Sequence, residues 1–412
     1  MNGLYSAAMG RILKLRGINI WYKRGNRPLI MFGFVLVFLF LLSYLTSDSC
    51  SGEKCNGNVP YITTFQQNHW RNTTKKRILR WTGFFSDKTW EGIDDRLFRR
   101  CKVQSCTMTN DRSLLDDSDA ILIHVGALWK VVGALDLPQS RLPFQRWIIY
   151  NVEPPPRTPI GFGQLAGLFN WTSFYRLDSD VPVFYGGYVR HNRVPYATNV
   201  SGKNFAARNY QLAAWMSSNC YDFGRRRLFI NDMKQRLPEF DLYGKCGGTR
   251  CPETICREVL SRYKFFFAIE NSLCRDYVTE KFWAALERRQ IPIVRGNIDY
   301  AKIAPPHSFI NADDFGSGKD LSDFLLRLSR NEDEYNKYLK WTERYDVYGE
   351  IEARREYFCD LCEALHDKSR PTQVYSNLDG WYNDELETCP QWMLGNQISR
   401  FIDGIKITLG LM

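Results

Sequence analysis

The stretch Tyr263–Trp283, YKFFFAIENSLCRDYVTEKFW, decides which fold we expect for this chain. It opens with an apolar and aromatic run, which is typical of a buried strand, and a polar loop follows from Glu270. Thr279 stands where a helix N-cap is expected, because apolar residues recur at helical spacing from Phe282 onward. The stretch therefore predicts a strand, a loop and a helix of an α/β protein.

This local pattern also suggests a chemical role. A loop between a strand and a helix N-terminus favours phosphorylated ligands, since unpaired amides and the helix dipole attract negative charge there. Lys281 adds a mobile cation for a diphosphate, and Glu270 or Glu280 offers a carboxylate to ribose hydroxyls. The same spacing also fits an ordinary strand, loop and helix with a surface Lys–Glu pair, and it does not choose between the two.

Similar patterns continue on both sides of this stretch. Short apolar runs alternate with amphipathic segments, a rhythm typical of βα units. We find no internal repeat and no low-complexity block. The pattern predicts two α/β halves with a seam near residues 190–215, and the apolar runs lie at residues 77–85, 116–129, 144–153, 239–244, 263–270 and 291–296.

Composition narrows the class of protein. The 412 residues are 44% hydrophobic and 24% charged, which excludes a collagen-like, mucin-like or wholly disordered chain. Six of the 55 basic residues and none of the 45 acidic ones lie within residues 1–47. The rest of the chain is only mildly basic, without the clustered basic face of a nucleic-acid-binding protein.

The basic N-terminus precedes an apolar segment. Leu29–Leu45 is a run of 17 uncharged residues, which reaches about 26 Å as a helix, enough to cross a thin bilayer. A cleaved signal peptide is the alternative, but this run is longer than usual and no small-residue cleavage site follows. We expect a cytoplasmic tail (1–28), a signal anchor (29–46) and a lumenal body, because basic residues flank the cytoplasmic side.

Two features beyond the anchor agree with a lumenal body. All twelve cysteines follow the apolar segment, on the side where disulfides form. The glycosylation sequons begin at Asn72, Asn170 and Asn199, also on that side. Polar, turn-rich residues 47–75 are expected to form a stem.

Cys359-Asp-Leu-Cys362 permits two interpretations. A C-x-x-C pair binds zinc in some proteins, but a zinc site would need a second pair or a histidine cluster at suitable spacing. The chain has only five histidines, which disfavours a zinc site, and its body is expected in the lumen, where disulfides form; we therefore favour disulfides. Cys101 and Cys106 are candidate partners that would tie the end of the body to its beginning, while the connectivity stays open.

The string IENSLCRDYVTEKFW closely resembles the diagnostic motif of the α1,3/α1,4-fucosyltransferases, FENS-x-x-x-DYxTEK, and the short strand ending in Gly that follows that motif is IPIVRG here. The resemblance covers roughly residues 75–390. NVEPPP, NWTSFYRLDSDVPVFYG, FDLYGKCGG and FCDLC occur in the family's order, and the additional cysteines resemble invertebrate members.

This resemblance implies a GT-B fold of two Rossmann-like domains with a cleft between them. Residues 76–205 would form the acceptor-side domain, residues 206–390 the GDP-fucose-binding domain and residues 391–412 a C-terminal tail. The implied reaction moves L-fucose from GDP-β-L-fucose to a GlcNAc hydroxyl with inversion, in an α1,3 linkage, by a type II Golgi membrane enzyme. Alternatives are O-linked protein acceptors, a different sugar donor, or a catalytically silent lumenal glycan-binding protein.

The same match assigns the catalytic and diphosphate-binding residues. Glu153 corresponds to the acid of the family's E-S-P-S motif and would be the catalytic base, although EPPP replaces ESPS here. Lys281 corresponds to the family's diphosphate-binding lysine. A second basic contact is Arg226, or Arg225 if the alignment carries a one-residue gap.

The remaining pocket residues follow from the same motifs. Arg176 retains the first arginine of YRRDSD, with a salt bridge to Asp178 or Asp180 as the alternative role. The match places four more residues in the nucleotide-sugar pocket or in bracing its loop: Glu270, Asn271, Tyr277 and Glu280.

We expect no metal site in this protein. Asp178-Ser179-Asp180 has the D-x-D form that binds a divalent ion in many glycosyltransferases, but the family it resembles uses basic side chains for this task. GDP-fucose is expected as donor substrate without a tightly bound cofactor, and a divalent cation is expected to stimulate at most. The expected partners are the glycan acceptor and the membrane, and self-association as a homodimer through the stem is compatible with this topology.

Overall fold

The computed structural model describes residues 62–64, 73–85, 90, 93–131, 134–158, 162–191, 204–208, 210–220, 224–371, 373–383 and 389. The expected tail (1–28), anchor (29–46) and C-terminal tail (391–412) lie outside these residues, as does most of the stem (47–75). Within the described ranges, no helix combines the length and the apolar character needed to cross a membrane.

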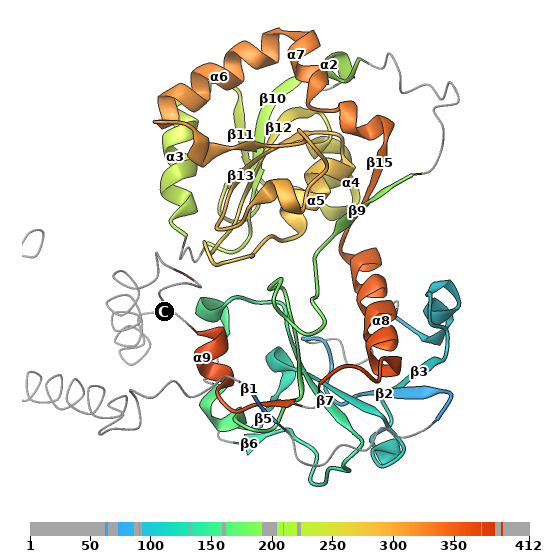
Figure 1. Ribbon diagram of the computed structural model, residues 1–412. Coiled ribbons are helices and arrows are strands. Elements are labelled where there is room, and N and C mark those ends of the chain that lie inside the picture. Colours follow the sequence, from blue (N-terminus) through green and yellow to red (C-terminus); the bar gives the residue numbers. More distant parts are fainter. Residues whose placement is uncertain are drawn as a thin grey trace, which may run out of the picture. The chain divides into compact units, whose positions relative to one another are not determined.

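The first half of the body contains a five-stranded parallel sheet (Figure 1). Its central strands β4 and β7 are buried along their whole length, as expected for a parallel sheet that is covered on both faces. The spatial order is β3-β2-β4-β7-β8. The strands are β2 (Lys76–Arg80), β3 (Cys106–Thr109), β4 (Ala120–His124), β7 (Arg146–Asn151) and β8 (Trp171–Phe174).

The second half contains another five-stranded parallel sheet with the same topology, in the order β11-β10-β12-β13-β14. In both sheets the first strand lies between the second and the third, so the chain reverses its direction of winding there. Ligands of such sheets bind at the carboxyl ends of the strands at this switch point. The strands are β10 (Gln211–Met216), β11 (Phe240–Tyr243), β12 (Tyr263–Ile269), β13 (Ile291–Arg295) and β14 (Ile310–Asn311).

Helices cover both faces of the second sheet. The helices α3, α6 and α7 contribute to the apolar core on one face, and α4 and α5 contribute to the core on the other. The helices of the described residues are α2 (Phe205–Arg208), α3 (Arg226–Arg236), α4 (Glu253–Leu260), α5 (Glu280–Glu287), α6 (Gly318–Arg330), α7 (Glu332–Lys337), α8 (Glu350–His366) and α9 (Leu378–Tyr382).

Three small antiparallel pairs complete the described strands. β9 pairs with β15 and β1 pairs with β16, so segments that are distant in the sequence meet in both cases. The third pair joins β5 and β6. The bounds are β1 (Ile62–Thr64), β5 (Trp129–Val131), β6 (Ala134–Leu135), β9 (Gly187–Arg190), β15 (Tyr345–Tyr348) and β16 (Gln373–Tyr375).

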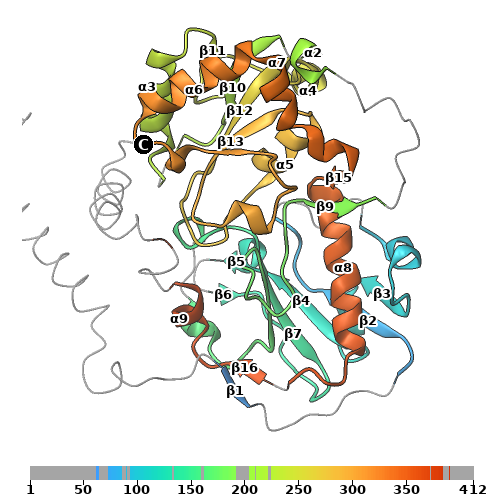
Figure 2. The ribbon, with the colours of Figure 1, turned by 45° about the horizontal axis from the view of Figure 1, so that its top comes forward.

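The end of the body returns to the first sheet, which differs from the division at residue 206 expected from the sequence. α8 lies along one face of the first sheet (Figure 2). Its apolar side chains, including Phe358 and Leu361, belong to the core on that face. Residues of β16 and α9, such as Tyr375 and Tyr382, join the core on the other face. In the described first half the connections carry short 3-10 helices, so α8 supplies cover that the buried sheet requires.

Disulfides reinforce this return. Cys359 is bonded to Cys101 and Cys362 to Cys106, which are the partners that the sequence suggested. These bonds join α8 to the first half across sequence separations of 258 and 256 residues. The other disulfides of the described residues are Cys220–Cys246, Cys251–Cys256 and Cys274–Cys389.

Removing the two long-range disulfides with Cys359→Ser and Cys362→Ser is expected to destabilise the body strongly. A disulfide that closes a loop of this length lowers the entropy of the unfolded chain and raises the free energy of unfolding by about 5 kcal/mol. A disulfide that closes a very short loop raises it by only about 2 kcal/mol. The matched control is therefore Cys251→Ser with Cys256→Ser, whose bond spans 5 residues. Guanidinium unfolding followed by tryptophan fluorescence measures both losses, and equal losses would contradict this account.

Candidate active site

A pocket of about 330 Å³ opens at the switch point of the second sheet. Residues that directly follow β10 and β12 line it, together with the first residues of α3 and α5. Four residues expected from the sequence are among them. The lining consists of Met216, Ser217, Ser218, Asn219, Arg226, Phe266, Asn271, Glu280, Lys281, Ala284 and Arg288.

Glu270 is a buried carboxylate next to this pocket that holds the start of α5 in place. It follows β12 directly and is completely buried. The amide and hydroxyl of Thr279 donate to its carboxylate at 2.9 Å, and Nζ of Lys281 lies 3.2 Å from its Oε2. Its oxygens are therefore held by the start of α5, and Glu270 positions Lys281 instead of facing the pocket.

The helix start expected at Thr279 is confirmed, but its cap differs from the usual form. Thr279 is the N-cap of α5 with an extended backbone, and its side chain accepts no capping bond from the helix. Its hydroxyl instead donates to Glu270 and accepts from Nζ of Lys281 at 2.6 Å. Amides of the first turn of α5 thus remain without this side-chain cap, which suits an anion site.

Lys281 is a partly accessible cation of the pocket. Its side chain is 18% exposed and pairs with Glu280 as well as with Glu270, at 3.2 Å in each case. Burial lowers the pKa of Lys281, but the two carboxylates outweigh it, so the pKa is raised overall. The ammonium is therefore charged at neutral pH. The half-exposed carboxylate of Glu280 has a lowered pKa because Lys281 outweighs the opposing effect of burial.

The structure distinguishes the two arginine candidates. Arg226 is buried in the pocket wall, whereas Arg225 is exposed and has a left-handed backbone just before α3. Nη2 of Arg226 donates to Oγ of Ser217 at 2.6 Å and to the carbonyl of Asn219 at 2.5 Å. The guanidinium thus braces the carboxyl end of β10 and adds positive charge near Lys281, on whose pKa it acts.

Asn271 contributes a polar atom that has no partner within the part of the chain that the structure describes. The residue is 8% exposed, lines the pocket, and its buried Oδ1 accepts no hydrogen bond from any described residue. The backbone of Gly224 donates to the Asn271 carbonyl at 2.8 Å, and an added Cβ there would lie 3.3 Å from the Glu270 carbonyl. An unpaired buried acceptor is costly, so this atom is suited to a ligand donor.

Glu153 comes from the first half, just after β7. Its backbone is held firmly, since its amide donates to Oδ1 of Asn151 at 3.2 Å and its carbonyl accepts from Asn151 and Tyr382. Its carboxylate, by contrast, has no hydrogen bond or ion pair with any residue that the structure describes. Burial raises the pKa of Glu153, and the raised value persists although Arg157 and Lys281 act to lower it.

Glu153 therefore belongs to the same electrostatic neighbourhood as the pocket. The charges of Lys281, Glu280 and Glu270 all act on its pKa. Tyr277 is 2% exposed, with its ring 5.0 Å from that of Tyr175. Burial raises the pKa of Tyr277, and the carboxylates of Glu153, Glu270 and Glu280 raise it further. Tyr277 is not among the residues that line the pocket and belongs to an apolar core instead, which fits the bracing role that the sequence left open beside direct binding.

Comparison with known proteins identifies the family. Residues 206–381 match the family model described as glycosyltransferase family 10 (fucosyltransferase) C-term, and residues 73–186 match the one described as fucosyltransferase, N-terminal. The chain is 33% identical over 337 residues to alpha-(1,3)-fucosyltransferase C of Drosophila melanogaster, covering 74% of this chain and 77% of that protein. The chain belongs to glycosyltransferase family 10, the fucosyltransferases.

Two further similarities are of the same kind. Alpha-(1,3)-fucosyltransferase 7 of Bos taurus is 35% identical over 293 residues, covering 69% of this chain and 79% of that protein. A solved structure, "Crystal Structure of alpha1,3-Fucosyltransferase with GDP-fucose", has a TM-score of 0.48 and 17% identity, covering 72% of this chain and 92% of that one.

In this fucosyltransferase Arg176 has the structural role that the sequence left open. It is 3% exposed, donates to both carboxylate oxygens of Asp178 at 2.8 and 2.6 Å, and lies over the ring of Trp381 at 4.4 Å. It does not line the pocket. Asp180 is also engaged, accepting from Thr172, Tyr375 and Gln373. Both acids of the D-x-D sequence therefore serve hydrogen bonds within the protein.

Asn170 is not placed as a glycosylation site requires. It is 1% exposed, its Nδ2 donates to the carbonyl of Gln373 at 2.8 Å, and its Oδ1 accepts from Trp147 at 2.9 Å. A glycan on Nδ2 would break this network, so the expectation from this sequon needs correction for the folded fucosyltransferase. Asn72 and Asn199 lie outside the described residues.

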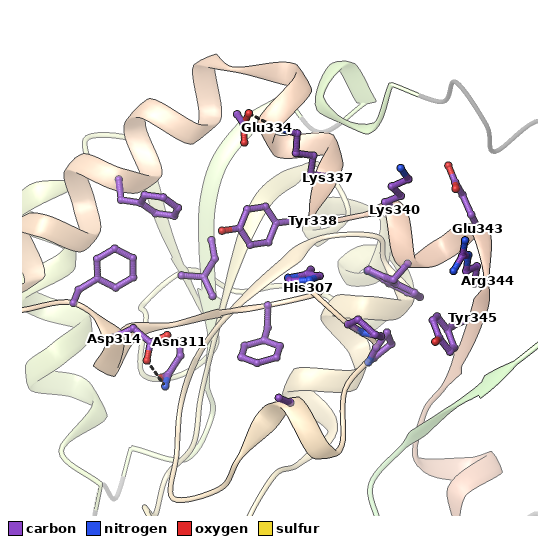
Figure 3. Close-up of a pocket in the computed structure, with 18 residues that line it drawn as sticks. His307, Asn311, Asp314, Glu334, Lys337, Tyr338, Lys340, Glu343, Arg344 and Tyr345 are labelled. Carbon is purple, nitrogen blue, oxygen red and sulfur yellow. Dashed lines mark hydrogen bonds and ion pairs between the residues drawn. The ribbon is translucent and has the colours of Figure 1, made fainter.

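A larger cavity lies elsewhere on the second half. It has a volume of about 1190 Å³ and contains His307, Tyr338 and Arg344, with Glu334 paired to Lys337 at its rim (Figure 3). It contains none of the residues expected from the fucosyltransferase motifs. Its charged residues are mixed in sign, so the smaller pocket at the switch point fits an anionic nucleotide better.

Sequence reasoning missed several residues of the site. Ser217 and Asn219 belong to the SSNC string, whose position directly after a strand was the signal available. Tyr185 donates to the carbonyl of Val152, immediately before Glu153, at 2.8 Å. Arg288 follows α5 and had no motif to mark it.

Proposed function

We propose that this fucosyltransferase moves L-fucose from GDP-β-L-fucose to a GlcNAc hydroxyl with inversion, forming an α1,3 linkage on glycoprotein or glycolipid glycans. One observation carries the proposal. A cationic nucleotide-sized pocket at the switch point of the second sheet lies within electrostatic reach of an unpaired carboxylate, Glu153, from the first half.

The pocket suits the donor's diphosphate. Lys281 and Arg226 supply positive charge, and the start of α5 supplies backbone amides and the positive end of the helix dipole. Asn271 offers a free acceptor, and the half-exposed carboxylate of Glu280 can accept from ribose hydroxyls. Because Glu270 and Thr279 hold Lys281 in place, its charge is oriented before the donor binds.

Glu153 suits the role of general base. As the acceptor oxygen attacks C1 of fucose, its proton passes to the Glu153 carboxylate. The bond between C1 and the phosphate oxygen breaks, and its electron pair leaves with GDP, whose growing charge faces Lys281 and Arg226. A carboxylate with a raised pKa and no other partner is a stronger base than an exposed one.

The proposal also covers the acceptor and the subcellular location of the enzyme. The fucosyltransferase similarity supports an α1,3 linkage to GlcNAc, with O-linked protein sites as the alternative acceptor and a silent glycan-binding protein as the alternative role. We propose a Golgi membrane enzyme with a single N-terminal span and a lumenal body, consistent with the five disulfides of the described residues.

A transfer assay tests this function directly. The full chain is incubated with radiolabelled GDP-fucose and, separately, GDP-mannose, with N-acetyllactosamine, a truncated N-glycan or a folded protein domain as acceptor. We expect label from GDP-fucose alone, on the GlcNAc of one of the two glycans, and we expect transfer to persist after divalent cations are chelated. Label on the protein domain alone would establish the alternative acceptor, and no transfer to any acceptor with GDP bound would favour the silent protein.

A further inference from the structure

Arg288 has an uncompensated guanidinium in the pocket wall. It is the C-cap residue of α5, and its Nε donates to Oε1 of Gln290 at 2.6 Å. Its Nη2 is buried and finds no acceptor among the described residues. Burial, together with nearby Arg257, lowers the pKa of Arg288 to about 10. A buried donor of this kind is costly unless a ligand satisfies it.

The surroundings hold this guanidinium in one orientation. It lies over the ring of Phe266, with 4.6 Å to the ring centroid, and Phe266 also lines the pocket. Gln290, which fixes Nε, is itself completely buried and donates to the carbonyls of Leu260 and Tyr263. The planar fork of Arg288 is therefore preorganised before any ligand binds.

The pocket has two distinct ends along α5. Lys281, Ala284 and Arg288 recur at helical spacing, so they share one face of the helix. Lys281 and Arg288 are separated by about 10 Å along the axis. The small side chain of Ala284 lies between them, which leaves room for a ligand to extend along the helix.

A nucleotide diphosphate can occupy this pocket in one favourable direction. The phosphates are attracted to the amino end of α5, where Lys281, Arg226 and the positive end of the dipole meet. The base then extends toward the carboxyl end and reaches Arg288. Guanine presents two adjacent acceptors, O6 and N7, to an arginine fork, whereas adenine presents an acceptor beside a donor and cytosine presents a donor.

We infer that Arg288 reads the guanine base of the donor nucleotide through its O6 and N7 edge. This inference rests on the proposed function, because it assumes that the donor's diphosphate binds beside Lys281. Arg288 is thus a specificity-determining residue, and Phe266 and Gln290 are the residues that position it.

The test compares the affinities of three nucleotides by isothermal titration. GDP and IDP both carry O6 and N7, whereas ADP lacks O6. We expect the unaltered enzyme to bind GDP and IDP about 10- to 100-fold more tightly than ADP. Arg288→Ala and Arg288→Met should lose this preference to within about threefold, with ADP binding nearly unchanged.

The design separates base reading from simpler effects. The ratio of two Kd values measured on one preparation does not depend on the folded fraction, so partial misfolding cannot imitate the result. Arg257→Ala removes a nearby exposed cation that does not line the pocket, and it should keep the preference for GDP. In transfer assays Arg288→Met should raise KM for GDP-fucose with little change in kcat, because Arg288 is distant from the reacting carbon.

Two results would overturn the inference while the proposed function stands. One is an Arg288→Ala enzyme that still transfers fucose and keeps the full preference for GDP over ADP. The other is an equal weakening of GDP and ADP, which would show that Arg288 acts on the diphosphate. If the unaltered chain neither bound GDP nor transferred fucose, the proposed function itself would fail, and this inference with it.

Discussion

Replacing Glu153 by glutamine is expected to lower the rate of fucosyl transfer by about 10²- to 10⁴-fold, the usual contribution of a positioned acid–base group. GDP affinity should stay close to that of the unaltered enzyme, because the substitution keeps the shape of the side chain and removes no group from the nucleotide pocket. Single-turnover rates with saturating GDP-fucose, together with GDP titrations, measure the two effects separately.

The pH profile offers a second readout of the same assignment. Burial raises the pKa of Glu153, so the deprotonated, active form is lost as pH falls through that raised value. We expect an acid limb in kcat/KM whose apparent pKa is higher than the ordinary value of a glutamate and which disappears in Glu153→Gln. Glu343→Gln, a partly exposed glutamate in the larger cavity, serves as the control and should keep both rate and profile. Near-normal turnover of Glu153→Gln would refute the assignment.

Replacing Lys281 by alanine should impair binding and chemistry together. The ammonium meets the diphosphate in the ground state and again as charge grows on the leaving group. We therefore expect GDP and GDP-fucose to bind about 10- to 100-fold more weakly, the value of a charge-assisted hydrogen bond. A further loss of about 10²-fold in kcat is expected from the weaker stabilisation of departing GDP. Titration with GDP and steady-state kinetics measure both quantities.

The control for this variant must separate charge from folding. Lys302→Ala removes an exposed lysine, also paired with a carboxylate, and should leave binding and rate unchanged. Thermal unfolding of Lys281→Ala shows whether the enzyme stays folded when the buried Glu270 keeps Thr279 as its remaining hydrogen-bond partner. Normal GDP affinity in a folded Lys281→Ala enzyme would show that the diphosphate does not bind at the start of α5.

The arrangement at the candidate pocket was partly predictable from the sequence because much of it is local. Glu270, Thr279 and Lys281 lie within one strand, loop and helix, so the order of apolar and polar residues already places them together. Similarity suggested Arg226 or Arg225 as the second basic residue, and only the structure distinguishes them, because Arg226 is buried in the pocket wall and Arg225 is exposed. By contrast, the hydrogen bond from Arg176 to the carbonyl of Trp381 joins residues 205 positions apart, and no local pattern indicates such a partner.

By itself the sequence determined the family, the α/β class and the strand, loop and helix around Glu270 and Thr279, because these depend on motifs and periodicities over short segments. Only the tertiary structure decided that α8 and α9 return to the first sheet, since covering a buried parallel sheet is a requirement of packing. It also decided that the Glu153 carboxylate lacks a partner among the described residues while the charge of Lys281 acts on it, and that Asn170 is enclosed. Burial and partner choice depend on contacts between distant segments, which the order of residues along the chain does not specify.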